Sequence, residues 1–201
     1  ILVEVDSWDL ASNFPSGHFV ETVGSVGDID TEIACLLIEH EINLPPFSAS
    51  ALACLPNVDH CEPWSIPEEE LAHRRDLRQS HRIFSVDPVG CVDIDDTMSA
   101  RVLMNGDVEF GVHIADVCHF VPHNSALDRE ARCRGTTFYL VDRRFDMLPT
   151  ILSSNLCSLH DNVDRLAVSV IITMSPDFDE VKSRWFGRTI IHNCAAMTYD
   201  Q

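Results

Sequence analysis

The pattern of apolar and polar positions changes along the first third of the chain. Residues 1–5 alternate and predict a β-strand, and residues 18–23 predict a second strand after a stretch rich in turn-forming residues. From residue 28 to 41, apolar side chains recur at helical spacing and predict an amphipathic helix. Shorter helices are expected over residues 48–55 and 68–78, where proline-bearing connections separate them.

From residue 83 onward the pattern is typical of β-structure. Residues 83–86 predict a strand, and residues 102–104 and 108–115 predict the two arms of a hairpin. The dipeptide Asn105-Gly106 lies between the arms and suits a type I′ turn.

The last third continues this mixture. A short helix is expected over residues 126–133 and a strand over residues 136–141. Residues 166–174 and 181–191 predict a second hairpin, and residues 198–201 look like the start of a helix. The succession of strands and helices predicts an α+β fold.

Composition supports a folded, intracellular protein. Hydrophobic residues make up 45% of 201 residues, which is enough for a packed core, and no apolar run is long enough to span a membrane. The eight cysteines form no CxxC pair, so neither a disulfide framework nor a zinc site is expected, and the cytosol or nucleus is the expected compartment. The chain starts without methionine or a basic leader, which favours an interior strand cut from a longer chain.

The chain is strongly acidic, and the acidic charge is uneven along the sequence. The formal net charge is −18, and the first 73 residues contain no lysine or arginine. Phosphate binding needs a positive surface, so the charge of this chain taken alone argues against a nucleic-acid partner. A solvated or protein-contacting surface is the simpler interpretation of the acidic first third.

Four carboxylates occur within ten residues, on a chain bent by proline and glycine between two predicted strands. They belong to Asp87, Asp93, Asp95 and Asp96. Carboxylates held this close repel one another unless a cation neutralises them, and hard oxygen ligands suit Mg²⁺, with Mn²⁺ as the alternative. Two such ions can activate water and stabilise the leaving oxygen of a phosphodiester.

Two other interpretations of this segment stay open at this point. A cluster of aspartates in a loop is often no more than a solvated turn. Residues 93–97 also match the Asp-x-Asp-x-Thr motif of haloacid-dehalogenase-type phosphatases, in which the first aspartate attacks phosphate. That motif has to follow a buried apolar strand, whereas Pro88 and Gly90 interrupt the strand here and a β-hairpin follows.

A resemblance over nearly the whole chain favours the metal site. The string of residues 87–96 resembles the active-site signature of the RNase II/RNase R superfamily, and four further motifs follow in the family order. These motifs occupy residues 111–117, 134–140, 146–149 and 152–159. Residues 5–8 and 14–20 are similar to the end of the second cold-shock barrel in the exosome-type members.

The resemblance implies a particular domain organisation. Residues 1–27 are expected to be the end of an OB-type (cold-shock) β-barrel, residues 28–82 a helical linker, and residues 83–201 the N-terminal half of an RNase II catalytic domain. The catalytic domain of the family continues past Gln201 and carries an arginine and further basic surface, which accounts for the acidic charge of this part. By itself, the 201-residue piece is therefore expected to be a poor nuclease.

The resemblance also implies an activity and a set of site residues. The activity is Mg²⁺-dependent, hydrolytic 3′-to-5′ degradation of single-stranded RNA ends to nucleoside 5′-monophosphates, with exosome core subunits as partners and no membrane. The four aspartates hold the metal ions, and Asp95 and Asp96 serve catalysis, with Asp95 indispensable. Tyr139 stacks near the RNA 3′ end, and Arg134 contacts RNA.

Several alternatives accompany these roles. Tyr139 could be a core tyrosine in a strand, while Arg143 and Arg144 could meet phosphates or be solvated. His113 and Asp116 are expected to organise the site and not to bind metal. A catalytically inactive fragment that acts as an exosome-binding or RNA-binding module is the alternative function.

Overall fold

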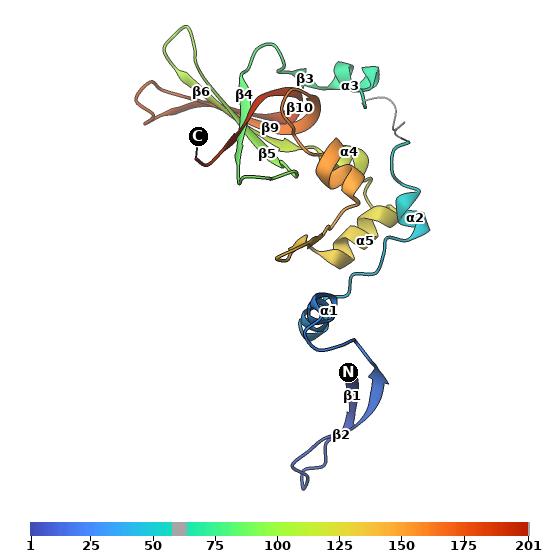
Figure 1. Ribbon diagram of the computed structural model, residues 1–201. Helices are drawn as coiled ribbons and strands as arrows, with labels where there is room; N and C mark the ends of the chain where they lie inside the picture. Colours follow the sequence, from blue (N-terminus) through green and yellow to red (C-terminus); the bar gives the residue numbers. More distant parts are fainter. Residues whose placement is uncertain (58–63, 201) are drawn as a thin grey trace. The chain divides into compact units, whose positions relative to one another are not determined.

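The computed structural model describes residues 1–57 and 64–200 and shows two compact units, Ile1–Pro46 and Phe47–Gln201 (Figure 1). Each unit has its own secondary structure. The expected boundaries after residues 27 and 82 stay a prediction. No helix in the described part of the chain is long and apolar enough to cross a membrane.

The first unit contains the two strands and the helix that the hydrophobic pattern predicts. Strand β1 (Leu2–Ser7) pairs antiparallel with β2 (Ser16–Glu21), and α1 (Ile29–Glu39) follows. The side chain of Asp28 caps α1 by accepting a hydrogen bond from the Thr31 backbone N–H at 3.1 Å. The two strands are exposed along nearly their whole length.

The second unit opens with short helices. Helix α2 (Ala49–Leu52) is capped by the Ser48 side chain, and α3 (Glu68–His73) begins after Pro67. The helix expected to run to residue 78 was wrong beyond residue 73. Arg74 is extended because its side chain turns into the protein, and β3 (Arg75–Asp76) then pairs parallel with a later strand.

Five strands of the second unit pair in a closed ring. Strand β4 pairs with β5, β5 with β6, β6 with β9, β9 with β10, and β10 again with β4. The strands are β4 (Ile83–Asp87), β5 (Asp96–Val102), β6 (Val108–Ala115), β9 (Asp164–Met174) and β10 (Val181–Thr198). Each of the five strands therefore pairs with two others of the ring.

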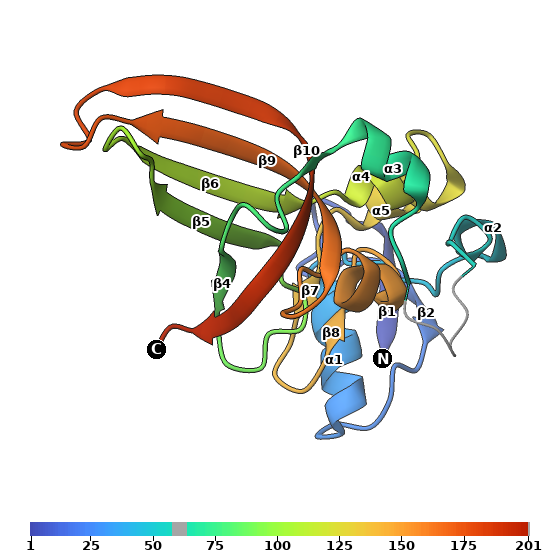
Figure 2. The ribbon, with the colours of Figure 1, turned by 90° about the horizontal axis from the view of Figure 1, so that it is seen from above.

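The long strand β10 closes the ring because it pairs with two other strands of the ring, β9 and β4. Its first part lies against β9 and its last part against β4, with an irregularity between Asn193 and Ala195 (Figure 2). A helix start at residues 198–201 was wrong for the described residues. Thr198 still belongs to β10, and residues 199 and 200 form a turn, while Gln201 lies outside the described residues.

The hairpin between β5 and β6 was predicted, but its first arm, expected over residues 102–104, shares only Val102 with β5, and its turn type was wrong. The N–H of Gly106 donates to the Leu103 carbonyl at 2.9 Å, and the N–H of Leu103 donates to Asp107 at 2.8 Å. Only Gly106 has a positive φ, of 90°, whereas a type I′ turn needs two such residues. The loop is therefore a three-residue connection with glycine in the left-handed position.

The ring has a polar interior. His113 is fully buried, and its two ring nitrogens lie 3.0 Å from the Ser99 hydroxyl and 2.7 Å from the Ser169 hydroxyl. Ser169 continues the network to Thr189 at 2.6 Å. A side chain on Gly111 would place its Cβ 2.4 Å from the Ser99 oxygen, so this network needs glycine at that position.

The outer face of β5, β6, β9 and β10 is apolar and exposed. Its cross-strand rows carry large side chains in direct register, and these are Met98, Val112, Ile114, Val168 and Phe186. Asp96 lies in the row of Ile114 and Val168, at the start of β5.

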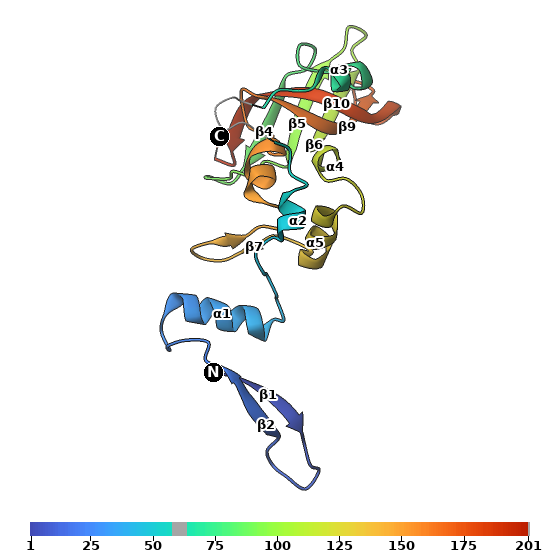
Figure 3. The same cartoon turned by 90° about the vertical axis from the view of Figure 1, so that its right-hand side faces the viewer.

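Helices and a small hairpin complete the core. Helix α2 lies beside α5 (Ala126–Arg134) in Figure 3 and contacts it. Between β6 and β9 the chain also forms α4 (Val117–Phe120), the strand pair β7 (Phe138–Tyr139) and β8 (Arg144–Phe145), and the π-helical turn η1 (Leu152–Leu156). The strand expected over residues 136–141 is thus confirmed only for its central two residues. Leucines of α5 and η1 pack with β4, β6, β9 and β10 in one hydrophobic core.

Candidate active site

The aspartate loop joins β4 to β5. Asp87 is the last residue of β4, Asp93 and Asp95 lie on the connection, and Asp96 is the first residue of β5. Gly90 has a φ of 83°, which lets the chain turn back between the two strands.

The backbone of the aspartate loop is anchored in the core. Ile94 is 4% exposed, its N–H donates to the Ser158 hydroxyl at 3.0 Å, and that hydroxyl donates to the Val92 carbonyl at 2.9 Å. The N–H of Leu159 donates to the Ile94 carbonyl at 2.8 Å. Burial of Ile94 therefore fixes the backbone of the loop at this point, and with it the positions of the neighbouring residues Asp93 and Asp95.

The hairpin of β7 and β8 contacts both carboxylate oxygens of one of the four aspartates, Asp93. Tyr139 and Arg144 are directly paired across this hairpin. The Tyr139 hydroxyl donates to Oδ2 of Asp93 at 2.6 Å, and Nη1 of Arg144 lies 2.9 Å from Oδ1. One cross-strand pair thus occupies both oxygens of one carboxylate.

Proton affinities differ between neighbouring aspartates. Burial by itself raises the pKa of Asp93, but the hydrogen bond from Tyr139 and the charge of Arg144 outweigh it and lower that pKa. The pKa of Asp95 is raised, first by loss of water around it and then by repulsion from the other three aspartates. The hydrogen bond to Asp93 raises the pKa of the Tyr139 phenol to about 12.

The donor chemistry of the aspartate loop fits a hard divalent cation. Asp87 has a buried oxygen, Oδ2, with no hydrogen-bond partner in the described structure, and the carboxylates around Asp95 repel one another. The side chains do not converge on one point, however. Within residues 1–57 and 64–200, no three His, Cys, Asp or Glu side chains form a group that could hold a metal ion.

A cleft of about 740 Å³ opens beside the aspartate loop. The loop lines one side of it, and the β7–β8 hairpin and the η1 region line the other. The lining residues from the hairpin and η1 are Tyr139, Arg144, Thr150 and Ser154, and those from the loop are residues 88–93 and Asp95. Tyr139 is 65% exposed, so its ring is accessible from this cleft and it is not a core tyrosine.

Three residues singled out in the sequence lie elsewhere. The Arg134 guanidinium stacks on the Phe47 ring at 3.8 Å and donates to the Asp146 carbonyl at 3.4 Å. His113 is inside the strand ring, and Asp116 is buried in an ion pair with Arg74 at 2.7 Å. His113 and Asp116 therefore support the site through the fold around it.

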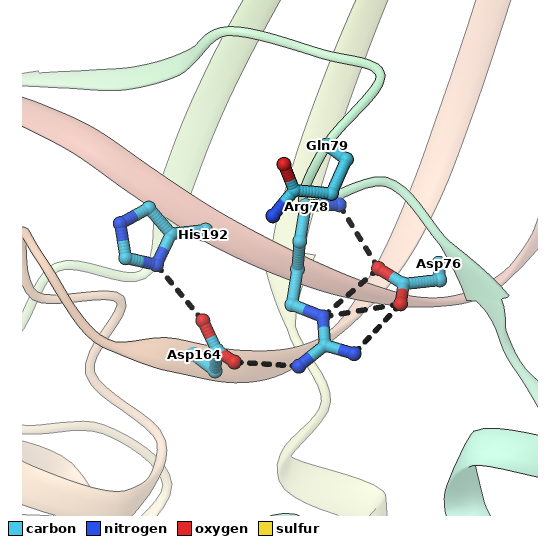
Figure 4. A pocket seen from close by; sticks show the side chains of 5 residues that line it. All are labelled: Asp76, Arg78, Gln79, Asp164 and His192. Atoms are coloured by element: carbon cyan, nitrogen blue, oxygen red, sulfur yellow. Dashed lines mark hydrogen bonds and ion pairs between the residues drawn. The ribbon is translucent and has the colours of Figure 1, made fainter.

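A second, smaller pocket of about 290 Å³ contains a chain of charged groups (Figure 4). Arg78 lies between Asp76 and Asp164, at 2.7 Å from each, and His192 lies 2.8 Å from the other oxygen of Asp164. Two carboxylates share the one guanidinium here, so this pocket offers no surplus positive charge for a ligand.

A closed ring of strands that presents four aspartates on one anchored loop defines a catalytic domain of the RNase II type. The chain belongs to the RNB domain family, which matches residues 74–201, and residues 1–41 match the Dis3-like cold-shock domain 2 (CSD2). The resemblance and the mixed fold expected from the sequence are thereby confirmed. The match to the RNB domain family goes against the phosphatase alternative, and so does the local structure, since β4 ends at Asp87, six residues before Asp93, and the next strand, β5, pairs antiparallel with β4.

Among curated relatives, the chain is 49% identical over 199 residues to exosome complex exonuclease RRP44 of Mus musculus. This match covers 99% of the chain and 20% of the relative. The chain spans about a fifth of the length of the curated relatives that it matches.

Solved structures share the fold. The chain matches Mycoplasma genitalium RNase R in complex with double-stranded RNA with a TM-score of 0.82 and 24% identity, over 99% of this chain and 34% of that one. It also matches yeast Ssd1, described as a pseudonuclease, with a TM-score of 0.75 and 25% identity, over 99% of this chain and 24% of that one. The fold therefore does not by itself decide whether a protein of this kind is active.

Sequence reasoning missed the arrangement around Asp93. Arg144 was considered only for phosphate contact or solvation, and Asp146 and Ser154, which hold it, had no assigned role. The available signal was the five-residue spacing between Tyr139 and Arg144 around a polar turn, which allows the two to pair across a short hairpin.

Proposed function

We propose that the protein is a divalent-metal-dependent 3′-to-5′ exoribonuclease that hydrolyses single-stranded RNA ends to nucleoside 5′-monophosphates. The observation that carries this proposal is the gathering of four aspartates on one core-anchored loop beside an accessible tyrosine. Relatives named exosome complex exonucleases support an RNA-decay role and suggest exosome core subunits as partners. Activity of the 201-residue chain alone is not part of the proposal.

The four loop aspartates are proposed to hold Mg²⁺, with Mn²⁺ as a substitute. Such ions supply a nucleophilic water and stabilise the leaving oxygen of a phosphodiester when they are bound. Asp95 and Asp96 are the proposed catalytic residues. Burial and then repulsion from the other three aspartates raise the pKa of Asp95, and a bound cation would relieve the repulsion.

Tyr139 is proposed to contact the RNA. Its ring is 65% exposed and its hydroxyl is fixed by Asp93, so an aromatic face is held at the cleft in a set orientation. Stacking of a base on such a face is commonly worth about 1–3 kcal/mol. Arg134 remains a proposed RNA contact that would have to act from the edge of the site, since its guanidinium stacks on Phe47.

The alternative is a catalytically silent binding module. The observation behind this alternative is the similarity of the fold to yeast Ssd1, which is described as a pseudonuclease. Presence of all four aspartates favours the enzyme, because a module that binds without catalysis has no need to concentrate carboxylates that repel one another.

The first prediction tests the metal site. Asp95→Asn in the full-length protein should abolish RNA hydrolysis and leave folding and RNA binding near wild type, because one charged ligand is lost while the backbone anchor at Ile94 stays. Turnover is measured with a labelled single-stranded RNA in saturating Mg²⁺. Asp177→Asn, the same change on the exposed β9–β10 turn, is the control and should keep full activity.

The products of the same assay separate the alternatives. Blocking the RNA 3′ end should prevent degradation, blocking the 5′ end should not, and chromatography should show nucleoside 5′-monophosphates. Wild-type-like turnover by Asp95→Asn would remove the basis of the metal assignment. RNA binding without any hydrolysis by the full-length wild type would favour the silent module.

A further inference from the structure

The four aspartates of the loop share very little positive charge. In the described parts of the chain, only Asp93 among them forms an ion pair, and its partner is Arg144. Arg144 is half-buried, and its charge is permanent because a guanidinium does not lose its proton in proteins. The permanent positive charge of the Arg144 side chain therefore lies beside the proposed metal site, next to Asp93.

Three contacts hold the Arg144 side chain in this position beside Asp93. Its Nη1 lies 2.9 Å from Oδ1 of Asp93, its Nε lies 2.9 Å from Oδ1 of Asp146, and its Nη2 donates to the Ser154 hydroxyl. A planar guanidinium can reach three acceptors at once in a fixed orientation, which a lysine ammonium on a flexible stem does not reproduce. Two of the three contacts, those with Asp146 and Ser154, come from outside the aspartate loop.

We propose that Arg144 is a positioning residue that holds Asp93 and the Tyr139 hairpin in place and, as a built-in countercharge, weakens the binding of divalent cations to the aspartate loop. This inference rests on the proposed function. Arg144 acts through Asp93, whose other oxygen is occupied by Tyr139.

The direction of the effect follows from electrostatics. A divalent ion that binds beside Asp93 must share this carboxylate with the guanidinium and is repelled by its charge. Removing the charge should therefore tighten metal binding. The same removal frees Asp93 and Tyr139 to move, so turnover should fall, because small displacements of groups in a catalytic site are costly. Structural damage would weaken metal binding and turnover together.

The test measures Mn²⁺ affinity in the absence of RNA, by electron paramagnetic resonance of free Mn²⁺, beside RNA turnover in the full-length protein. Arg144→Met should bind Mn²⁺ roughly tenfold more tightly than wild type and degrade RNA more slowly. Arg144→Lys keeps the charge and loses the three-point contact. Its Mn²⁺ affinity should stay near wild type, and its turnover should fall as well.

Two further variants keep the result interpretable. Arg143→Met removes the neighbouring arginine, which pairs with Asp142 at 2.7 Å, and should leave Mn²⁺ affinity unchanged. Tyr139→Phe removes only the hydrogen bond to Asp93 from an exposed side chain, so it should fold normally and tighten Mn²⁺ binding by less than Arg144→Met does.

The outcomes separate this inference from the function on which it rests. Unchanged or weaker Mn²⁺ binding by both Arg144→Met and Tyr139→Phe, in a wild-type background that is an active nuclease, would overturn the inference alone. A wild-type protein that neither binds Mn²⁺ at this site nor degrades RNA would overturn the proposed function and this inference with it.

Discussion

At the scale of single residues, His113 shows how the strand ring tolerates a polar interior. Burial lowers the pKa of His113 to about 4, so the imidazole is neutral at physiological pH and can satisfy Ser99 and Ser169 at the same time. Hydrogen bonding on both sides offsets the cost of placing a polar ring among strands.

His113 makes stability depend on pH in a defined window. The folded-state pKa lies below the value of about 6.5 in an unfolded chain, so protonation favours the unfolded state as pH falls from 6.5 toward 4. Between pH 7 and pH 5, wild type should lose about 2 kcal/mol more of its unfolding free energy than His113→Gln. Urea unfolding at both pH values measures this difference, and equal losses in the two proteins would contradict it.

At the scale of elements, one buried ion pair ties the segment after α3 to the end of β6. The Arg74 side chain is fully buried and lies 2.7 Å from Asp116, and Arg74 also pairs with Glu70 within α3. A long polar side chain that points inward is why the chain leaves the helix at this residue, where φ is −122° and ψ is 147°.

Breaking this pair from one side should be costly. Asp116→Ala leaves the buried Arg74 guanidinium with Glu70 as its remaining carboxylate partner and should lower the unfolding free energy by up to about 3–5 kcal/mol. The double variant Arg74→Met with Asp116→Leu should be clearly more stable than Asp116→Ala, because the buried guanidinium is gone and the Glu70 carboxylate that loses its partner is partly exposed to water. Chemical denaturation of the three proteins tests this order, and a double variant no more stable than the single one would contradict it.

The charged chain in Figure 4 provides the matched comparison. Arg78 also bridges two carboxylates at 2.7 Å, but the groups involved are between 28% and 46% exposed. Water screens such pairs, so Arg78→Met should cost no more than about 1 kcal/mol. Ion pairs of the same length should thus contribute more to the unfolding free energy at the buried Arg74 than at the partly exposed Arg78.

At the scale of the whole molecule, the net charge of −18 opposes RNA binding by the chain alone. The described contacts place cationic side chains beside carboxylates, as in Arg144 with Asp93 and Arg74 with Asp116. The chain has 14 lysines and arginines against 32 acidic residues, and phosphate neutralisation by cationic side chains supplies most non-specific RNA affinity.

The 201-residue chain should therefore bind single-stranded RNA at least roughly tenfold more weakly than the full-length protein at the same salt concentration. Fluorescence anisotropy of a labelled RNA, titrated at low and moderate salt, measures both affinities. Equal affinities, with a steep salt dependence for the chain alone, would show that its acidic composition does not govern RNA binding.

Much of the fold could be predicted because its strands carry strong periodic patterns. β4, β6, β9 and α5 were found close to their observed positions, whereas β10 was expected to end at residue 191 and runs to Thr198. The closed ring was not predicted, since pairing of β4 with β10 joins segments far apart in sequence and leaves no local pattern. The length of α3 was overestimated because helical spacing carries no information about the buried partner of Arg74.

The candidate site was predictable to the extent that it is local. The four aspartates lie within ten residues, so their spacing alone indicated that they share a loop. The contact between Asp93 and Arg144 crosses from the aspartate loop to another hairpin, and two neighbouring arginines gave no reason to choose one. Only Arg144 is paired directly opposite Tyr139 in the hairpin.

Closure of the ring by its last strand sets an order of events during synthesis. Ile83 of β4 pairs with Asn193 of β10, and translation of the chain between them takes roughly 5–20 seconds at ordinary rates. Until β10 emerges, β4 is an edge strand whose only strand neighbour is β5, with which it shares two residue pairs, so the start of the aspartate loop is weakly held. The four loop aspartates should therefore reach their final positions late, when the nascent chain has been completed through residue 198.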